Sequence, residues 1–148
     1  MKLASDLREF IGLLNSHEVE YVLVGAYAMA FHTRPRYTED IDILVRPTPE
    51  NAARVETVLR AFTFTSLGLS ASDFEKPEQI VQLGVPPNRI DLITCITGVS
   101  FDEAWAGRQH GELDGVPVAF LSKECLIRNK TATGRPKDRE DLRRLTES

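Results

Sequence analysis

The chain has 148 residues, of which 42% are hydrophobic and 27% are charged. This length suits a single domain, 1–148, and the composition excludes a disordered chain. Its short apolar runs exclude a membrane-spanning helix, and we expect no secretory signal at the N-terminus. Cys95 and Cys125 lack metal-binding spacing, which excludes a zinc ribbon or a disulfide scaffold and makes a reducing cytoplasm the simplest compartment.

The net charge of −4 does not by itself indicate a nucleic-acid binder, but the charge is unevenly distributed. Residues 123–144 contain eight basic and four acidic side chains, so this segment carries +4 and the remainder carries −8. A basic segment beside an acidic body suits an anionic substrate that meets a carboxylate-held metal. The alternative is a solvated helix face with ion pairs one turn apart.

Hydrophobic periodicity and turn signals predict the secondary structure in chain order. The expected elements are helix 3–16, strand 21–24, helix 26–31, strand 41–45, a helix from Pro49, a loop with one short helical turn over 63–78, strands 80–85 and 89–94 around a turn at 86–88, helix 101–108, a turn and short strand over 112–118, helix 123–131 and a last helix from Pro136 to about 145.

Several residues mark the ends of these elements. Pro117 indicates that its short strand lies at the edge of the sheet. Ser122 is a cap for the helix that follows it, and Gly134 ends that helix. We therefore expect a basic helical C-terminal segment over 122–146. The order of elements indicates an α/β (α+β) fold with one mixed β-sheet and helices mainly on one face.

Asp40 and Asp42 are two residues apart at the start of a predicted strand, so both carboxylates project from the same face. Two like charges this close repel each other unless a cation lies between them. The pair is therefore a candidate divalent-metal site, and a solvated strand edge is the simpler alternative.

Asp91 lies within the apolar run 90–93, where a carboxylate is costly to bury without a partner. If a neighbouring strand brings it beside the first two carboxylates, the three form a pocket for one or two Mg²⁺ ions. The alternative is an aspartate at the edge of the core that pairs with Arg89 or Arg36.

Gly25 and Ala26 follow a buried strand and begin a helix, an arrangement that offers backbone N–H groups to a phosphate. An ordinary strand-to-helix turn is the alternative. Arg34 and Arg36 lie between this turn and the aspartate pair. Phosphate cradle, cations and metal carboxylates thus follow one another in the order that nucleotidyl transfer needs.

Residues 24–32 (VGAYAMAFH) and 36–45 (RYTEDIDILV) together resemble the DNA polymerase β-type nucleotidyltransferase superfamily. Within it, the Arg-x-Thr-x-Asp-x-Asp form is similar to minimal nucleotidyltransferases near the AbiEii toxin group. Lys130 and residues 134–142 (GRPKDREDL) resemble the C-terminal element of the same group. The resemblance covers about 21–145 and implies the polymerase β-type nucleotidyltransferase fold.

The resemblance assigns roles to individual residues. Gly25 matches the first glycine of the turn that holds the triphosphate. Asp40 and Asp42 match the metal-binding pair, and Asp91 matches the third carboxylate, a metal ligand and the base for the attacking hydroxyl. Ala26 departs from the family, which has serine or glycine there, so a hydroxyl contact to phosphate is lost while the backbone N–H remains.

Four further residues are candidates for contact with the nucleotide. Arg36 directly precedes the metal-binding strand, and Thr38 either touches substrate or caps and packs. Lys130 and Lys137 are candidate phosphate contacts, and their alternative is a salt bridge to Asp138 or Asp141.

The resulting expectation is a Mg²⁺-dependent enzyme that transfers a nucleoside monophosphate from a nucleoside triphosphate such as ATP to an acceptor hydroxyl, with release of pyrophosphate. Candidate acceptors are an RNA such as tRNA and a protein side chain. Candidate settings are a toxin–antitoxin pair with a cognate partner, and a homodimer. The alternatives are a non-catalytic antitoxin or scaffold, which Ala26 favours, and an aminoglycoside-type resistance enzyme, which the basic C-terminal segment opposes.

Overall fold

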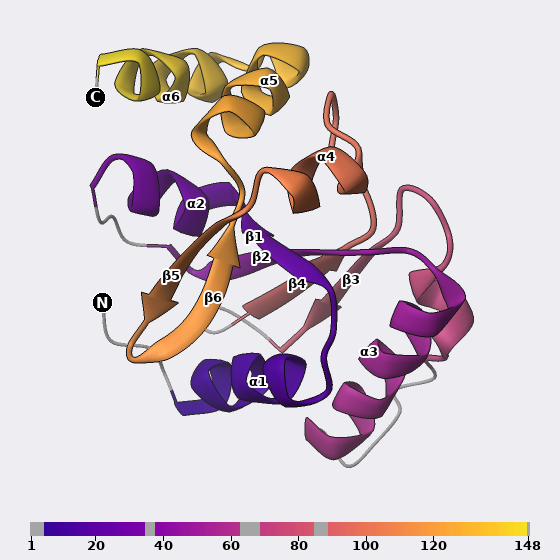
Figure 1. Ribbon diagram of the computed structural model, residues 1–148. Helices are drawn as coiled ribbons and strands as arrows, with labels where there is room; N and C mark the ends of the chain where they lie inside the picture. The colour runs from indigo at the N-terminus through magenta and orange to yellow at the C-terminus, as the bar shows by residue number, and fades with distance from the viewer. Residues whose placement is uncertain (1–4, 35–37, 63–68, 85–88, 148) are drawn as a thin grey trace.

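The computed structural model describes residues 5–34, 38–62, 69–84 and 89–147 (Figure 1). The chain order of its elements is α1 (Ser5–Ser16), β1 (Tyr21–Val24), α2 (Gly25–His32), β2 (Asp40–Val45), α3 (Pro49–Phe62), the 3₁₀ turn η1 (Ala71–Phe74), β3 (Ile80–Leu83), β4 (Arg89–Ile93), α4 (Phe101–Ala106), β5 (Gln109–Leu113), β6 (Val116–Phe120), α5 (Lys123–Thr133) and α6 (Pro136–Glu147). Each predicted helix and strand has a counterpart here, and the predicted turn at 86–88 lies outside the described residues.

The six strands form one mixed sheet in the order β3-β4-β2-β1-β6-β5. β2 runs antiparallel to β1 and parallel to β4, while β6 is parallel to β1 and the outer strands β3 and β5 are antiparallel to their neighbours. The expected mixed-sheet α+β fold is confirmed. Since β2 and β4 are parallel neighbours, residues at matching positions of the two strands face the same side of the sheet.

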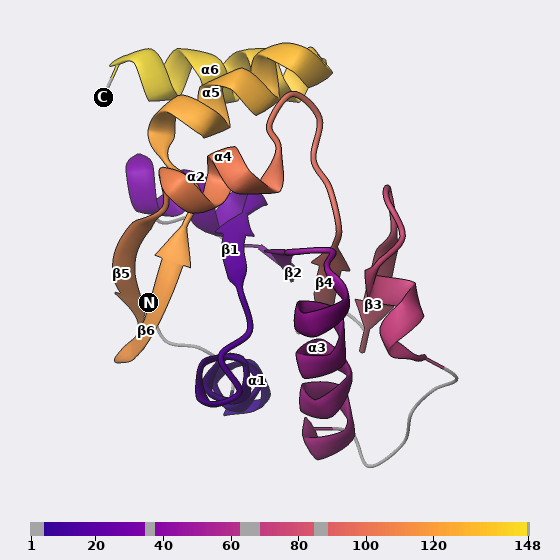
Figure 2. The same ribbon diagram turned by 45° about the vertical axis from the view of Figure 1, so that its right-hand side comes forward.

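The helices cover both faces of the sheet, more evenly than the expectation of helices mainly on one face (Figures 1 and 2). One buried cluster joins alternate strand residues to α1 and α3, and a second joins the other residues to α2, α4, α5 and α6. The strand sequences encode both clusters: in β1, Tyr21 and Leu23 belong to the first, Val22 and Val24 to the second. A sheet that is apolar on both sides needs cover on both.

β6 corrects the interpretation of Pro117. The strand lies inside the sheet, between β1 and β5, rather than at its edge. Proline is tolerated here because the register joins β6 to β1 only at Phe120, opposite Leu23, three residues beyond the proline. Pro117 pairs across the antiparallel ladder with Glu112 of β5, which is the real edge strand.

The last two helices form a hairpin that packs over α2 at one end of the molecule (Figures 1 and 2). Ser122 caps α5 by accepting a hydrogen bond from the Cys125 N–H, and Gly134 ends it at φ +60°. Both were expected from the sequence. Leu126 of α5 and Leu145 of α6 belong to the same buried cluster as Ala28 and Met29 of α2, so the hairpin fixes the position of α2.

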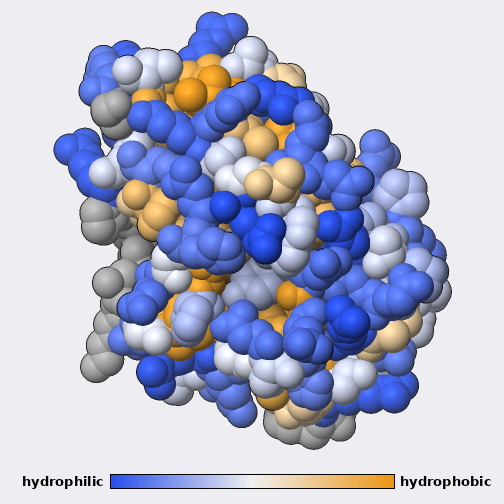
Figure 3. Space-filling model, viewed as in Figure 1, coloured by the Kyte–Doolittle hydropathy of each residue, from blue (hydrophilic) through white to orange (hydrophobic). Residues whose placement is uncertain are grey.

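Among the described residues, no helix combines the length and the apolar character needed to cross a membrane. The face seen in Figure 3 is predominantly hydrophilic, and its hydrophobic residues form small separate areas.

Candidate active site

Three carboxylates meet on the face of the sheet that carries α2. The register of β2 and β4 sets Asp42 opposite Asp91 and Asp40 opposite Arg89. Asp40, Asp42 and Asp91 each offer an oxygen atom, and these atoms all lie within 4.8 Å of one another. The alternation of β2 explains the direction of two of them: Ile41 and Ile43 are completely buried on the opposite face, so Asp40 and Asp42, which alternate with them, project toward α2.

Arg89 lies between two of these carboxylates. Its Nη2 donates to Asp40 Oδ2 at 2.6 Å and to Asp91 Oδ2 at 3.1 Å, while its Nε donates to Asp91 Oδ1 at 2.9 Å. Arg89 thus binds both oxygens of Asp91 and one oxygen of Asp40. The two interpretations of Asp91, as a third carboxylate and as a partner of Arg89, describe the same arrangement.

Thr38 orients the first aspartate. Its hydroxyl donates to Asp40 Oδ1 at 3.1 Å and to the Asp40 carbonyl at 3.0 Å. The side chain thereby fixes Asp40 at the point where the chain enters β2, which is the capping alternative weighed from the sequence. Arg36 lies outside the described residues.

Among the three aspartates, Asp42 has the raised pKa. Burial raises its pKa to about 7, and the charges of Asp40 and Asp91 act in the same direction. Arg89 lowers this pKa, but it is the smallest of these influences and donates no hydrogen bond to Asp42. The cluster therefore holds more negative charge than its own cation balances, the condition that favours binding of a further cation.

Gly25 connects this cluster to the start of α2. It adopts φ +65°, and a Cβ at this position would lie 2.2 Å from Asp42 Oδ2. Only glycine fits so close an approach of backbone to carboxylate. Val24, the N-cap residue, accepts no hydrogen bond through its side chain. The first backbone N–H groups of α2, including that of Ala26, are therefore not capped by it. A positive helix end thus adjoins the three carboxylates.

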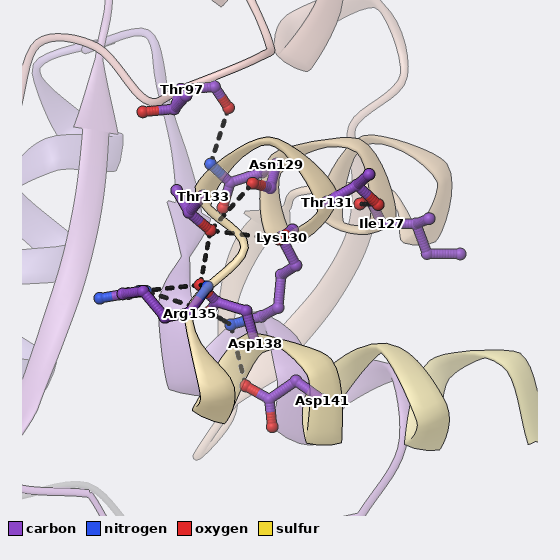
Figure 4. Close-up of polar contacts among 9 residues, drawn as sticks. All are labelled: Thr97, Ile127, Asn129, Lys130, Thr131, Thr133, Arg135, Asp138 and Asp141. Carbon is purple, nitrogen blue, oxygen red and sulfur yellow. Dashed lines mark hydrogen bonds and ion pairs between the residues drawn. The ribbon is translucent and has the colours of Figure 1, made fainter.

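The two candidate lysines lie in the helical hairpin. Lys130 is 5% exposed, and its Nζ lies 2.9 Å from Asp141 Oδ2 and 3.5 Å from Asp138 Oδ1 (Figure 4). The structure thus places Lys130 in the salt bridges that the sequence offered as the alternative to phosphate contact. Lys137 is exposed on α6.

Asp138 is the centre of this second cluster. It is fully buried, and its Oδ2 accepts hydrogen bonds from the Thr133 hydroxyl at 2.6 Å and from Nε of Arg135 at 2.8 Å (Figure 4). The backbone N–H of Arg135 donates to the same oxygen, and these bonds, led by Arg135, hold the pKa of Asp138 well below its usual range. The residues that resemble a family element thus join α5 to α6.

The donor set suits a divalent cation with hard oxygen preferences. Three carboxylates can hold Mg²⁺, whose ligands lie at about 2.1 Å, so oxygens up to about 4.2 Å apart can share one ion. The observed limit of 4.8 Å is near this span. Among the described residues this is the acidic group with that geometry.

Comparison with known proteins gives a family and a fold. A family model described as "nucleotidyl transferase of unknown function (DUF2204)" matches residues 3–148. Among curated proteins, no sequence match was found. A nucleotidyltransferase-type protein of Thermotoga maritima, TM1012, shares 20% sequence identity at a TM-score of 0.59, with 96% of this chain and 91% of that chain covered.

An antibiotic-resistance factor and an antibiotic adenylyltransferase have the same fold. The structure of ANT(2″)-Ia with adenylyl-2″-tobramycin matches at 16% identity and a TM-score of 0.59, over 95% of this chain and 86% of the other. The lincosamide antibiotic adenylyltransferase LnuA, with lincomycin bound, matches at 12% identity and a TM-score of 0.57, over 98% and 97%. Sequence identities this low establish the shared fold alone. The family model, in contrast, matches residues 3–148, so the protein belongs to the DUF2204 family of nucleotidyl transferases.

Proposed function

We propose that this protein transfers a nucleoside monophosphate from a nucleoside triphosphate to an acceptor hydroxyl, with Mg²⁺ held by Asp40, Asp42 and Asp91. The observation that carries this proposal is the meeting of three carboxylates, from two parallel strands, with the uncapped start of α2 at Gly25. A triphosphate and three carboxylates repel each other unless a cation lies between them.

The reaction forms a bond between the acceptor oxygen and the α-phosphorus and breaks the bond from that phosphorus to the oxygen of the departing pyrophosphate. The divalent cation, when bound, would neutralise charge on the phosphates. Gly25 and Ala26 would present backbone N–H groups to the phosphates. Asp91 would accept the proton of the attacking hydroxyl, a role that requires Arg89 to release at least one of its oxygens.

Four further residues have different roles in this proposal. Thr38 would act through Asp40, which it orients, rather than through the nucleotide. Lys130 would act by holding the hairpin that fixes α2, since its amine is enclosed by two aspartates. Arg36 and Lys137 remain candidate phosphate contacts of this proposal.

The acceptor is open between three classes: an RNA such as tRNA, a protein side chain, and a small antibiotic of the kind named for ANT(2″)-Ia and LnuA. The basic character of residues 123–144 distinguishes them poorly, because many of these cations are paired within the hairpin: Lys130, Arg135, Arg143 and Arg144. A toxin–antitoxin setting with a cognate partner, following the AbiEii resemblance, belongs to the RNA and protein classes, and a homodimer is compatible with each.

A non-catalytic scaffold is the second candidate function. Two observations favour it: Ala26 provides no hydroxyl, and Arg89 already occupies part of the carboxylate cluster. Such a protein would bind neither metal nor nucleotide through this cluster.

Calorimetry of nucleoside triphosphate binding with and without Mg²⁺ tests the proposal. We expect binding that requires the metal. Equal affinity in both conditions, or no binding in either, would contradict the transferase and favour the scaffold. Transfer of an α-labelled nucleotide to RNA, to protein and to an aminoglycoside or lincosamide then distinguishes the acceptor classes.

A further inference from the structure

We propose that Arg89 is a resident counter-ion of the carboxylate cluster, which competes with a divalent cation for Asp40 and Asp91. This inference rests on the proposed function, because it concerns the loading of the same site. It assigns a role to a residue that lies outside the segments 24–32, 36–45 and 130–142.

The hydrogen bonds define the competition atom by atom. Arg89 donates to both oxygens of Asp91 and to Oδ2 of Asp40, at 2.6 to 3.1 Å. An ion that used all three aspartates would need oxygens from the same two carboxylates. A guanidinium and a divalent cation also repel each other at such short range. Arg89 must therefore withdraw at least part of its contact when such an ion binds.

The surroundings of Arg89 allow that withdrawal. Its side chain is 28% exposed, whereas that of Asp91 is 9% exposed, so the guanidinium can turn toward solvent while the carboxylate stays. Asp40 keeps its place because Thr38 holds its other oxygen. The aspartates would thus remain in position after Arg89 has left.

Because Arg89 belongs to the same chain as the aspartates, it competes effectively with a free cation for their oxygens. Its register position in β4, directly opposite Asp40, keeps the guanidinium within reach of both carboxylates even after it turns toward solvent. A cation from solution therefore competes with an intramolecular one, which raises the metal concentration needed to load the site. Without metal, the same contacts limit the repulsion among the three aspartates.

Arg89→Gln tests the proposal through two measurements that require no turnover. Mg²⁺ affinity is measured by calorimetry without nucleotide, and thermal stability is measured in the presence of a chelator. We expect Mg²⁺ to bind at least about tenfold more tightly to the variant, because a like charge next to the site is removed. We expect a lower Tm in chelator, because three hydrogen bonds to the aspartates are lost.

Two further variants make the test specific. Arg46→Gln is the matched control, since Arg46 directly follows β2 and pairs with Glu20 and Asp102 away from the cluster. It should lower Tm and leave Mg²⁺ affinity unchanged. Arg89→Lys keeps a cation but not the forked geometry, and should give an intermediate affinity; it also serves if Arg89→Gln does not fold.

The outcomes separate this inference from the proposed function. Unchanged or weaker Mg²⁺ binding by both Arg89 variants, with normal binding by the wild type, overturns the competition and leaves the transferase standing. If the wild type and both variants bind no Mg²⁺ without nucleotide, the competition fails, and nucleoside triphosphate binding with and without Mg²⁺ decides the transferase separately. Tighter binding by Arg89→Gln, with Arg46→Gln unchanged, supports the inference.

Discussion

Two ionic clusters of the molecule use the same residue types and differ in their balance of charge. On the sheet, three aspartates share one arginine, and burial raises the pKa of Asp42 to about 7. In the helical hairpin, Lys130 and Arg135 meet Asp138 and Asp141, and the pKa of Asp138 lies well below its usual range. The raised pKa of Asp42 marks a cluster with excess negative charge, which favours a further cation. The lowered pKa of Asp138 marks a cluster whose charges are matched.

The comparison shows why a basic residue in a segment that resembles a family motif is not necessarily a substrate contact. Lys130 was a candidate for phosphate binding, yet its amine lies enclosed between two carboxylates. A buried, matched cluster holds two helices together, and removing one partner leaves an uncompensated charge. The unmatched cluster lies next to the start of α2, where the proposed function puts the phosphates of the nucleotide.

The largest effect is expected for Asp42→Asn, which removes a charge from the unmatched cluster. Asparagine has nearly the same shape, so the fold should persist, and relief of repulsion should raise the Tm of the metal-free protein. Transfer of labelled nucleotide should fall by at least about 10² to 10³, because charge stabilisation carries most of phosphoryl-transfer catalysis. Glu112→Gln, the same charge change at an exposed position of β5, is the control and should retain activity. An Asp42→Asn protein as active as the wild type would contradict the site.

Asp138→Asn should break the matched cluster. The loss of a buried carboxylate that serves Arg135, Thr133 and Lys130 should destabilise the protein by about 3–5 kcal/mol in denaturant unfolding. Its exposed neighbour on α6, Glu140→Gln, should change stability far less. If Asp138→Asn instead kept its stability and lost metal-dependent nucleotide binding, the hairpin cluster would belong to the site.

Two glycines sharpen the same contrast, since both have positive φ and each lies beside one cluster. Gly134→Ala should cost about 1–2 kcal/mol of stability, the price of a left-handed alanine, because its Cβ would meet nothing closer than 3.8 Å. Gly25→Ala adds a collision with Asp42 and should cost more, about 3 kcal/mol, and weaken Mg²⁺ binding as well. Equal effects of Gly25→Ala and Gly134→Ala on stability and on Mg²⁺ affinity would show that the start of α2 shifts to make room for the added Cβ.

The smallest effect is the pH dependence of stability without metal. The pKa of Asp42 is raised on folding, so its contribution to stability is full below the ordinary value of 3.8 and is lost as pH rises through about 7. Between pH 5 and 8 the Tm in chelator should therefore fall, on the order of 3–6 °C. Asp138, with its lowered pKa, stays ionised throughout this window.

Two comparisons check the origin of that slope. Asp42→Asn should flatten it, and saturating Mg²⁺ should stabilise the wild type more at pH 8 than at pH 5. A slope that survives in Asp42→Asn would assign the titration to another group.

The local patterns of the sequence determined the elements and the residues of the cluster. Period-two and helical spacing placed most strands and helices near their observed positions, and the alternation around Asp40 and Asp42 fixed their common face. The strand β5 was missed, because its sequence, QHGEL, has no alternation of apolar and polar residues. The spacing of Gly25 from these aspartates indicated a phosphate turn beside a metal pair. The positions of the elements and the common face of the two aspartates could be predicted because they depend on neighbours within a few residues, where backbone geometry alone sets direction. The phosphate turn and the metal pair stay predictions.

Only the tertiary structure decided what each charge does. Register between β2 and β4 placed Arg89 against Asp40, 49 residues away, and the packing of α6 on α5 enclosed Lys130. It also placed β6 inside the sheet despite Pro117, and helices on both faces. The function of an ionisable group depends on its solvent exposure and on the charges around it, and in a folded chain those are set by residues far apart in sequence.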